Sequence, residues 1–114
     1  MNSLIELNQI ISGLNVLVET GKFSEEPSYE YMVVTPLTDT FALYGDDLPL
    51  RTVEEVRISI FCKNNYIALK NRLIKSLLNS GFVITDRRYV GHEDDTGYYH
   101  YAIDVAKDYE VEEV

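Results

Sequence analysis

The sequence has one cysteine, no tryptophan and no apolar run approaching the ~20 residues of a membrane-spanning helix. Cys62 on its own excludes an internal disulfide framework and fits a reducing compartment. No basic segment precedes an apolar one at the N-terminus, so we expect no signal peptide. These absences predict a protein that is made in the cytoplasm and does not use the membrane.

Glycine and proline are also few, with six and three residues in a chain of 114. The glycines stand singly, which excludes a glycine-rich phosphate loop, and no nucleophile elbow or zinc-ligand spacing is present. Cys62 could pair with His92 or His100 as thiolate and imidazole, but it ends an apolar strand pattern and is more typical of a small buried hydrophobe. We therefore predict no catalytic residue, no cofactor site and no enzyme activity.

Metal-ligating residue types concentrate in residues 92–95 (HEDD), together with His100. Oxygen donors in a loop bounded by glycines can hold a hard cation. The run lacks the alternating ligand spacing of an EF-hand loop, so the acidic tip of a hairpin is the better interpretation. We predict no metal site.

Positive charge is in the minority, because 10 Lys and Arg face 19 Asp and Glu, for a formal net charge of −9. This balance argues against general nucleic-acid binding. The charge is uneven: residues 57–88 hold seven basic residues and one acid, a sum of +6 that leaves −15 on the remainder. Either these charges form a solvated helix face and solubilising loops, or the surface has opposite poles suited to head-to-tail contact between copies.

Residues 53–82 are the best-specified local structure. Apolar and polar residues first alternate, which predicts a half-buried strand whose apolar members are Val56, Ile58 and Ile60. The period then becomes helical, with an apolar stripe of Tyr66, Leu69, Leu73 and Leu77, widened by Ile74 and Leu78. Asn64 or Asn65 can cap the start of this helix. Gly81 followed by Phe82 predicts a Schellman motif at its end.

The rest of the chain predicts a first helix over residues 3–14, with Ser3 as its cap and Glu6 at the capping-box position. Strand patterns cover residues 16–18, 29–36, 38–44, 82–90 and 98–105, with loops at 45–50 and 91–97. Pro36 either ends the second strand or marks an edge position. The nine tyrosines lie mostly in these patterns, where they can form cross-strand pairs or face an interface. Residues 108–114 are typical of a frayed acidic tail. Together they predict one α+β domain over residues 1–114: a mostly antiparallel sheet with two helices packed on one face.

Three stretches, in order, resemble small tail proteins encoded by phages and prophages of Gram-positive bacteria. They are residues 41–50 (FALYGDDLPL), the strand-to-helix join at 57–66 (RISIFCKNNY), and the acidic turn and Tyr/His-rich strand at 93–101 (EDDTGYYHY). The resemblance implies a tail terminator, or tail completion protein, with helices packed on one side of a sheet. Such structural virion proteins cap the head-proximal end of the tail tube, usually as a homohexameric ring.

The resemblance also implies where the protein works and what it contacts. The chain would be made in the cytoplasm of a host bacterium and end in a virion tail or a phage-tail-like particle. Its partners would be itself and the tail tube protein, with the sheath or head–tail connector as further candidates. DNA would pass through the ring without specific binding, and an acidic lumen would reduce sticking to phosphate.

The charge split suggests which residues make these contacts. A ring that closes by rotation is heterologous, so one patch must complement a different patch on the next copy. The candidate interface residues are the basic helix face (Lys70, Arg72, Lys75) and the acidic loops (Asp46, Asp47, Glu93, Asp94, Asp95). Two alternatives stay open. One is a head–tail connector or minor tail component, and the other is a small acidic regulatory protein whose surface mimics DNA.

Overall fold

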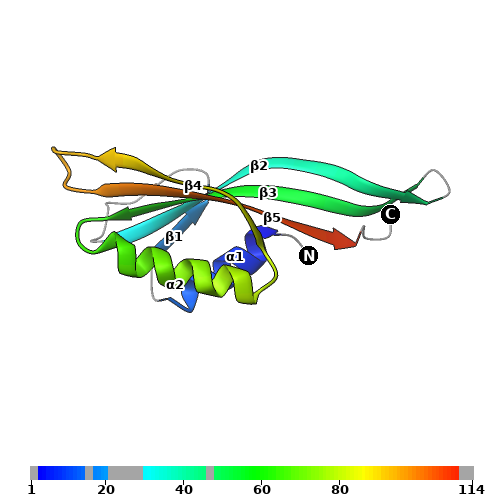
Figure 1. Ribbon diagram of the computed structural model, residues 1–114, viewed down its shortest axis with the longest axis horizontal. Helices are drawn as coiled ribbons and strands as arrows, with labels where there is room; N and C mark the ends of the chain where they lie inside the picture. Colours follow the sequence, from blue (N-terminus) through cyan, green and yellow to red (C-terminus); the bar gives the residue numbers. More distant parts are fainter. Residues whose placement is uncertain (1–2, 15–16, 21–29, 46–47, 111–114) are drawn as a thin grey trace.

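The computed structural model describes residues 3–14, 17–20, 30–45 and 48–110. In chain order its elements are α1 (Ser3–Ser12), β1 (Leu17–Thr20), β2 (Glu30–Gly45), β3 (Leu48–Cys62), α2 (Tyr66–Asn79), β4 (Val83–His92) and β5 (Tyr99–Glu110). The strands form one sheet in the order β1-β2-β3-β5-β4. Four are antiparallel and β1 adds in parallel to β2. Both helices pack on the same face of the sheet (Figure 1), which confirms the predicted α+β fold.

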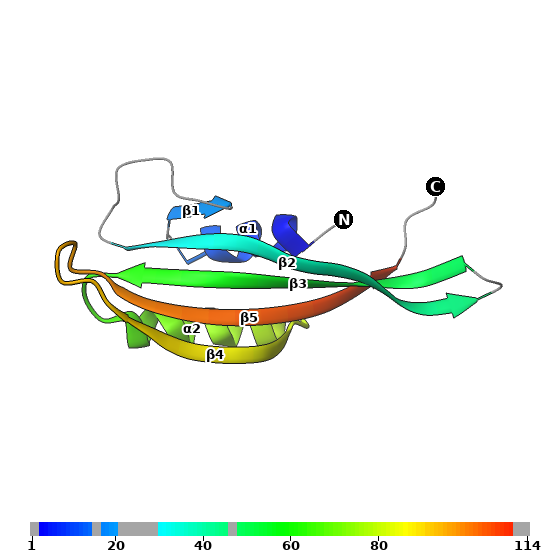
Figure 2. The same cartoon turned by 90° about the horizontal axis from the view of Figure 1, so that it is seen from above.

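The core lies between the helices and this face of the sheet. The alternation predicted for β3 is confirmed, because Val56, Ile58 and Ile60 are at most 1% exposed. Leu73 at the centre of the α2 stripe is fully buried, and Leu7 and Ile11 of α1 join the same cluster. α1 lies behind the β1–β2 side of the sheet and α2 behind the β5–β4 side (Figure 2). Each helix therefore covers its own half of the sheet.

Both ends of α2 are formed as predicted. The Asn65 side chain accepts a hydrogen bond from the backbone N–H of Ala68 at 3.2 Å. At the other end, the Phe82 N–H donates to the Leu77 carbonyl at 3.0 Å and Gly81 has a φ of 86°. These are the bonds and the left-handed glycine of a Schellman motif. The helix starts and stops on local signals alone.

The predicted capping box of α1 is wrong. α1 ends at Ser12, and the N–H and Oγ of Ser3 both donate to Glu54 Oε1 in β3, at 2.7 and 2.6 Å. Glu6 accepts from Lys107 and Tyr109 at the far end of β5. Both side chains that the local pattern predicts as caps of α1 therefore form hydrogen bonds with residues far away in the sequence.

β2 is one 16-residue strand, so Pro36 does not end it, and the alternative prediction of an edge position is confirmed. β1 pairs with β2 only as far as Val34, and Pro36 faces Val56 just before a register shift. Proline can stay in a strand at such a position, because the outer edge needs no N–H donor there and the shift relieves the ladder. The predicted loop at 45–50 is correspondingly short, since β2 reaches Gly45 and β3 begins at Leu48.

The C-terminal end of the described chain belongs to the sheet. β5 runs to Glu110, so the tail predicted from residue 108 is wrong for its first three residues. Asp108 and Glu110 lie beside Arg51, whose Nη atoms are 3.0 and 4.0 Å from their carboxylates. Residues 111–114 lie outside the described residues.

The sheet narrows toward one end into a projecting hairpin. β4 pairs no further than Ala106 of β5, and β5 pairs no further than Arg51 of β3. Beyond that point β2 and β3 continue alone, past both helices (Figures 1 and 2). We call residues 38–45 and 48–55 the arm, and the helix-covered part the body. The arm accounts for the elongated shape, with extents of 55 × 26 × 23 Å.

Candidate assembly surface

The three cations predicted on α2 do not share one face of the helix. The Nζ of Lys70 lies 5.0 Å from the ring centroid of Tyr101 in β5. Arg72 is two residues on, a turn of about 200°, and donates from Nη2 to the Leu14 carbonyl at 3.1 Å. Lys75 is exposed, and no ion pair joins it to another described residue. Arg72 thus ties α2 to the end of α1, while Lys70 and Lys75 remain on the outer surface.

Of the predicted acidic loop residues, the structure describes Glu93, Asp94 and Asp95. They form the β4–β5 turn, on the side away from the arm (Figure 1). The Glu93 carboxylate accepts from Thr96 at 2.8 Å, and Asp94 lies 3.0 Å from Nδ1 of His92. Asp46 and Asp47 lie outside the described residues, and the part of these five acids in assembly stays a prediction.

Cys62 and His100 lie on opposite faces of the sheet. Phe61 is the register partner of His100, and the next residue, Cys62, points to the helix side and is 1% exposed. Burial raises the pKa of the Cys62 thiol, which disfavours the thiolate that a nucleophile needs. Within the described residues, no three His, Cys, Asp or Glu side chains gather where they could hold a metal ion. The geometry offers this chain no hydrolytic pair at Cys62.

His100 instead belongs to an aromatic cluster on the sheet face away from the helices. Its ring stacks on Phe61 at 4.2 Å between centroids, and Phe61 stacks on Tyr31 at 4.7 Å. Its Nε2 is buried and has no hydrogen-bond partner among the described residues. Burial lowers the pKa of His100, with Arg57 acting in the same direction and Glu93 opposing. A neutral imidazole therefore packs as an aromatic ring.

A second tyrosine cluster lies on the helix face, beside the start of α2. The Tyr66 ring is 5.5 Å from Tyr99, 5.8 Å from Tyr89 and 5.9 Å from Tyr101, measured between centroids. Tyr101 is buried, whereas Tyr89 on the edge strand is 50% exposed. The cluster is therefore cross-strand and helix–sheet packing that ends in an exposed ring, and a role for the tyrosines at an interface stays a prediction.

A partly buried network around Lys107 joins β5 to both helices. The Nζ of Lys107 donates to Glu6 Oε2 at 2.9 Å and to the Ser80 carbonyl at 2.7 Å. Burial alone raises the pKa of Glu6, but hydrogen bonds from Tyr109 and Lys107, and the charge of Lys107, outweigh it and lower the pKa. Burial and the bond to Glu6 raise the pKa of Tyr109. The network therefore ties the end of β5 to the helices, and the bonds from Ser3 to Glu54 tie α1 to the base of the arm.

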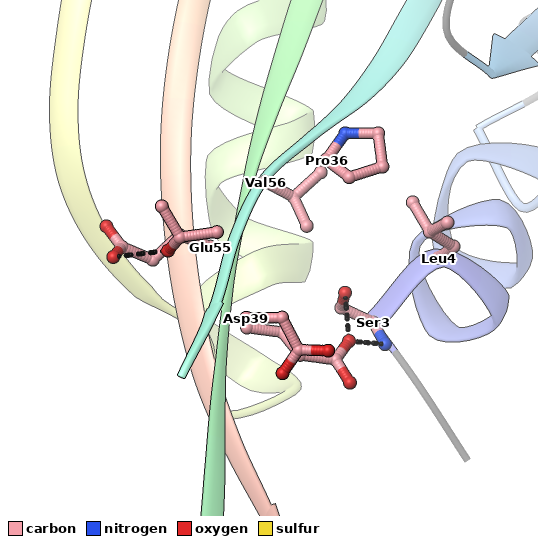
Figure 3. Close-up of a pocket in the computed structure, with 8 residues that line it drawn as sticks. Ser3, Leu4, Pro36, Asp39, Glu55 and Val56 are labelled. Atoms are coloured by element: carbon pink, nitrogen blue, oxygen red, sulfur yellow. Dashed lines mark hydrogen bonds between the residues drawn. The ribbon is translucent and has the colours of Figure 1, made fainter. Parts of the chain in front are cut away.

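A pocket of about 230 Å³ opens at the base of the arm (Figure 3). Its lining comes from α1 (Ser3, Leu4), β2 (Pro36, Thr38, Asp39) and β3 (Glu54, Glu55, Val56). Glu54 is already bonded to Ser3, and Asp39 accepts from Thr52 at 2.7 Å. Glu55 accepts from Thr38 at 2.8 Å on the far side of the strands. The carboxylates are thus used to join α1 and the arm strands, and no described base or nucleophile faces them.

Acidic side chains dominate the arm and the strand end beside it. The described acids there are Asp39, Glu54, Glu55, Asp108 and Glu110. The basic residues in this region are Arg51 and Lys107, and both are already paired, with Asp108 and Glu6 respectively. The arm therefore presents net negative charge about its base, while α2 contains no acid at all.

Sequence reasoning missed the arm, although a signal for it exists. Gly45-Asp46-Asp47 separates two runs rich in β-branched and aromatic residues, which is the pattern of a hairpin. Reading Pro36 as a strand end, and residues 48–50 as loop, concealed the length of both strands. Arg87 on β4 is also exposed, but from the sequence it is included only in the charge of the basic segment and not among the candidate interface residues.

No helix among the described residues is both long and apolar enough to cross a membrane. The sequence matches no protein-family model and no curated protein.

Proposed function

We propose that this protein is a tail terminator: a structural protein that assembles as a ring on the head-proximal end of a phage tail or phage-tail-like tube. The proposal comes from the resemblance of residues 41–50, 57–66 and 93–101 to such proteins. The observation that most supports it is the arm, a hairpin fixed to a compact body and extending past both helices. An exposed two-stranded hairpin is marginally stable alone and gains from a surface to pack against.

The distribution of charge also supports assembly. Acids gather on the arm, and α2 and β4 carry cations, so complementary surfaces lie on different parts of one chain. Such an arrangement suits heterologous contacts, which close into rings when the rotation allows. The sheet and its helices supply the rigid support, and the function is mechanical: one face of the ring stops tube growth and the other accepts the connector.

The decisive experiment uses the tail tube protein encoded beside this chain. Tubes are polymerised with and without the purified protein, and their lengths and ends are measured by negative-stain electron microscopy. We expect tubes that stop growing and carry extra density at one end, and native mass spectrometry of the released caps to give a hexamer. Unchanged tube length and unmodified tube ends would contradict the proposal.

The same preparation tests the alternatives. Binding to the head–tail connector, with no effect on tube growth, would favour a connector component. A monomer that competes with DNA for a DNA-binding protein would favour the acidic regulatory role.

A further inference from the structure

The outer side of α2 carries a second apolar stripe, of which Ile74 packs against the core cluster while Ile67 and Leu78 stay exposed. Ile67, Lys70, Ile74 and Leu78 follow the spacing i, i+3, i+7 and i+11, so they line one side of the helix. Ile67 is 50% exposed and Leu78 is 57% exposed. The contact of Lys70 with Tyr101 places this stripe on the β4–β5 side, away from α1. The stripe is thus an apolar surface with one cation in it.

The edge strand β4 extends this surface. Tyr89 and Arg87 are register partners of the helix-side residues Tyr101 and Ile103, so they lie on the same face of the sheet as α2. Tyr89 is 50% exposed, and no ion pair joins Arg87 to another described residue. We call Ile67, Lys70, Leu78, Arg87 and Tyr89 the α2–β4 flank. It combines exposed apolar side chains with Tyr89 and Arg87, residue types that are enriched at interfaces, and Lys70 adds a second positive charge.

We infer that the α2–β4 flank of one copy is the seat for the arm of a second copy. The charges are complementary, since the flank carries Lys70 and Arg87 and one face of the arm carries the register partners Asp39 and Glu54.

The contact must be between molecules. The arm continues the line of the sheet and leaves the body beyond both helices, so it cannot fold back over its own α2 (Figures 1 and 2). Because the arm and flank are different surfaces, the contact is heterologous, and each copy can both give an arm and receive one. This assignment rests on the self-assembly that the proposed function requires, and it names the surfaces that make it.

Side-chain packing, and not strand addition, is the expected mode. β4 has register shifts after Ile84 and after Tyr89, and β2 has one after Pro36. Bulges, proline and charge on an edge strand block pairing with another strand. The arm therefore lies across the flank by its side chains, without extending the sheet.

Disulfide trapping between two single-cysteine proteins tests the contact. Cys62→Ala removes the native thiol, Thr52→Cys marks the face of the arm that carries Asp39, and Leu78→Cys marks the flank. Gln9→Cys, on the exposed side of α1, is the matched control. Mixed under mild oxidation, the arm and flank proteins should form a heterodimer at least about tenfold faster than the arm and control proteins. Equal rates, or no heterodimer, would overturn the inference. If Cys62→Ala does not fold, the same pairs are made with the buried Cys62 retained.

Charge exchange provides a second readout. Asp39→Lys on the arm, or Lys70→Glu with Arg87→Glu on the flank, should each slow trapping by about tenfold. Mixing the reversed arm with the reversed flank should restore the rate. Asp95→Lys, on the turn at the other end, should change nothing. Loss without restoration would contradict the pairing. Tube capping that persists without arm–flank trapping would reject this contact and leave the proposed function standing.

Discussion

The body and the arm use the same two strands in opposite ways. In the body, β2 and β3 have neighbours on both sides and two helices over one face, so Val34, Ile58 and Ile60 are fully buried. In the arm the same strands first extend beyond the strands that pair beside them, and then extend beyond both helices. Residues such as Leu37, 42% exposed at the start of the arm, are left at the surface. The buried end of this strand pair therefore stabilises the fold, while its exposed end presents a surface for contacts with other molecules.

The sharpest test of this division is truncation in the core. Leu73→Ala should lower the free energy of unfolding by about 2–5 kcal/mol, because it leaves a cavity between α2 and the sheet. Thr40→Ala in the arm should change it by less than about 0.5 kcal/mol. Urea unfolding followed by circular dichroism measures both. Similar losses for the two variants would mean that the arm shares the stability of the body.

A smaller effect is expected where the two regions join. Lys107→Met removes the ion pair with Glu6 and the bond to the Ser80 carbonyl, which should cost about 1.5–3 kcal/mol. Arg51→Met, whose partner Asp108 is well exposed, should cost clearly less. Urea midpoints compare the two variants. If Arg51→Met were the more damaging, the Lys107 network would not be the main link between β5 and the helices.

The turn after α2 gives a backbone test within the body. Gly81 has a φ of 86°, a conformation that costs a residue with a Cβ about 1–2 kcal/mol. Gly81→Ala should destabilise by that amount, while Asn79→Ala, exposed in the last turn of the helix, should be near neutral. Thermal unfolding measures both, and a Gly81→Ala protein as stable as the parent would contradict the Schellman ending.

The smallest effect is the dependence of stability on pH. The folded-state pKa values of His100 and Glu6 both lie below their ordinary values of 6.5 and 4.5. The unfolded chain therefore binds protons first, so stability should fall as pH drops below about 6.5 and again below about 4.5. His100→Phe keeps the stack on Phe61 and should abolish the upper part of the fall. Urea midpoints between pH 4 and 8 test this, and a midpoint rising toward low pH would have the wrong sign.

The parts of the fold that sequence predicted well are those set by nearby residues. The strand alternation from Val56 to Ile60, the Asn65 cap and the Gly81 ending of α2 each follow from side-chain spacing or backbone preference within a few positions. The candidate assembly surface was predicted less well. Lys70 and Arg72 are both positive and close in sequence, but the helix places their side chains on different sides. Lys70 lies over the ring of Tyr101, and Arg72 donates to the Leu14 carbonyl.

Sequence alone determined that this chain is an acidic α+β protein with one strongly patterned strand–helix unit, because periodicity and capping are local. Only the tertiary structure decided that Pro36 stays within a strand, that Glu6 binds Lys107 instead of capping α1, and that the β2–β3 hairpin outgrows the body. The first two depend on partners 20 and 101 residues away in sequence, and the third on where the neighbouring strands and helices end. Such contacts produce no repeating pattern in the local sequence from which they could be predicted.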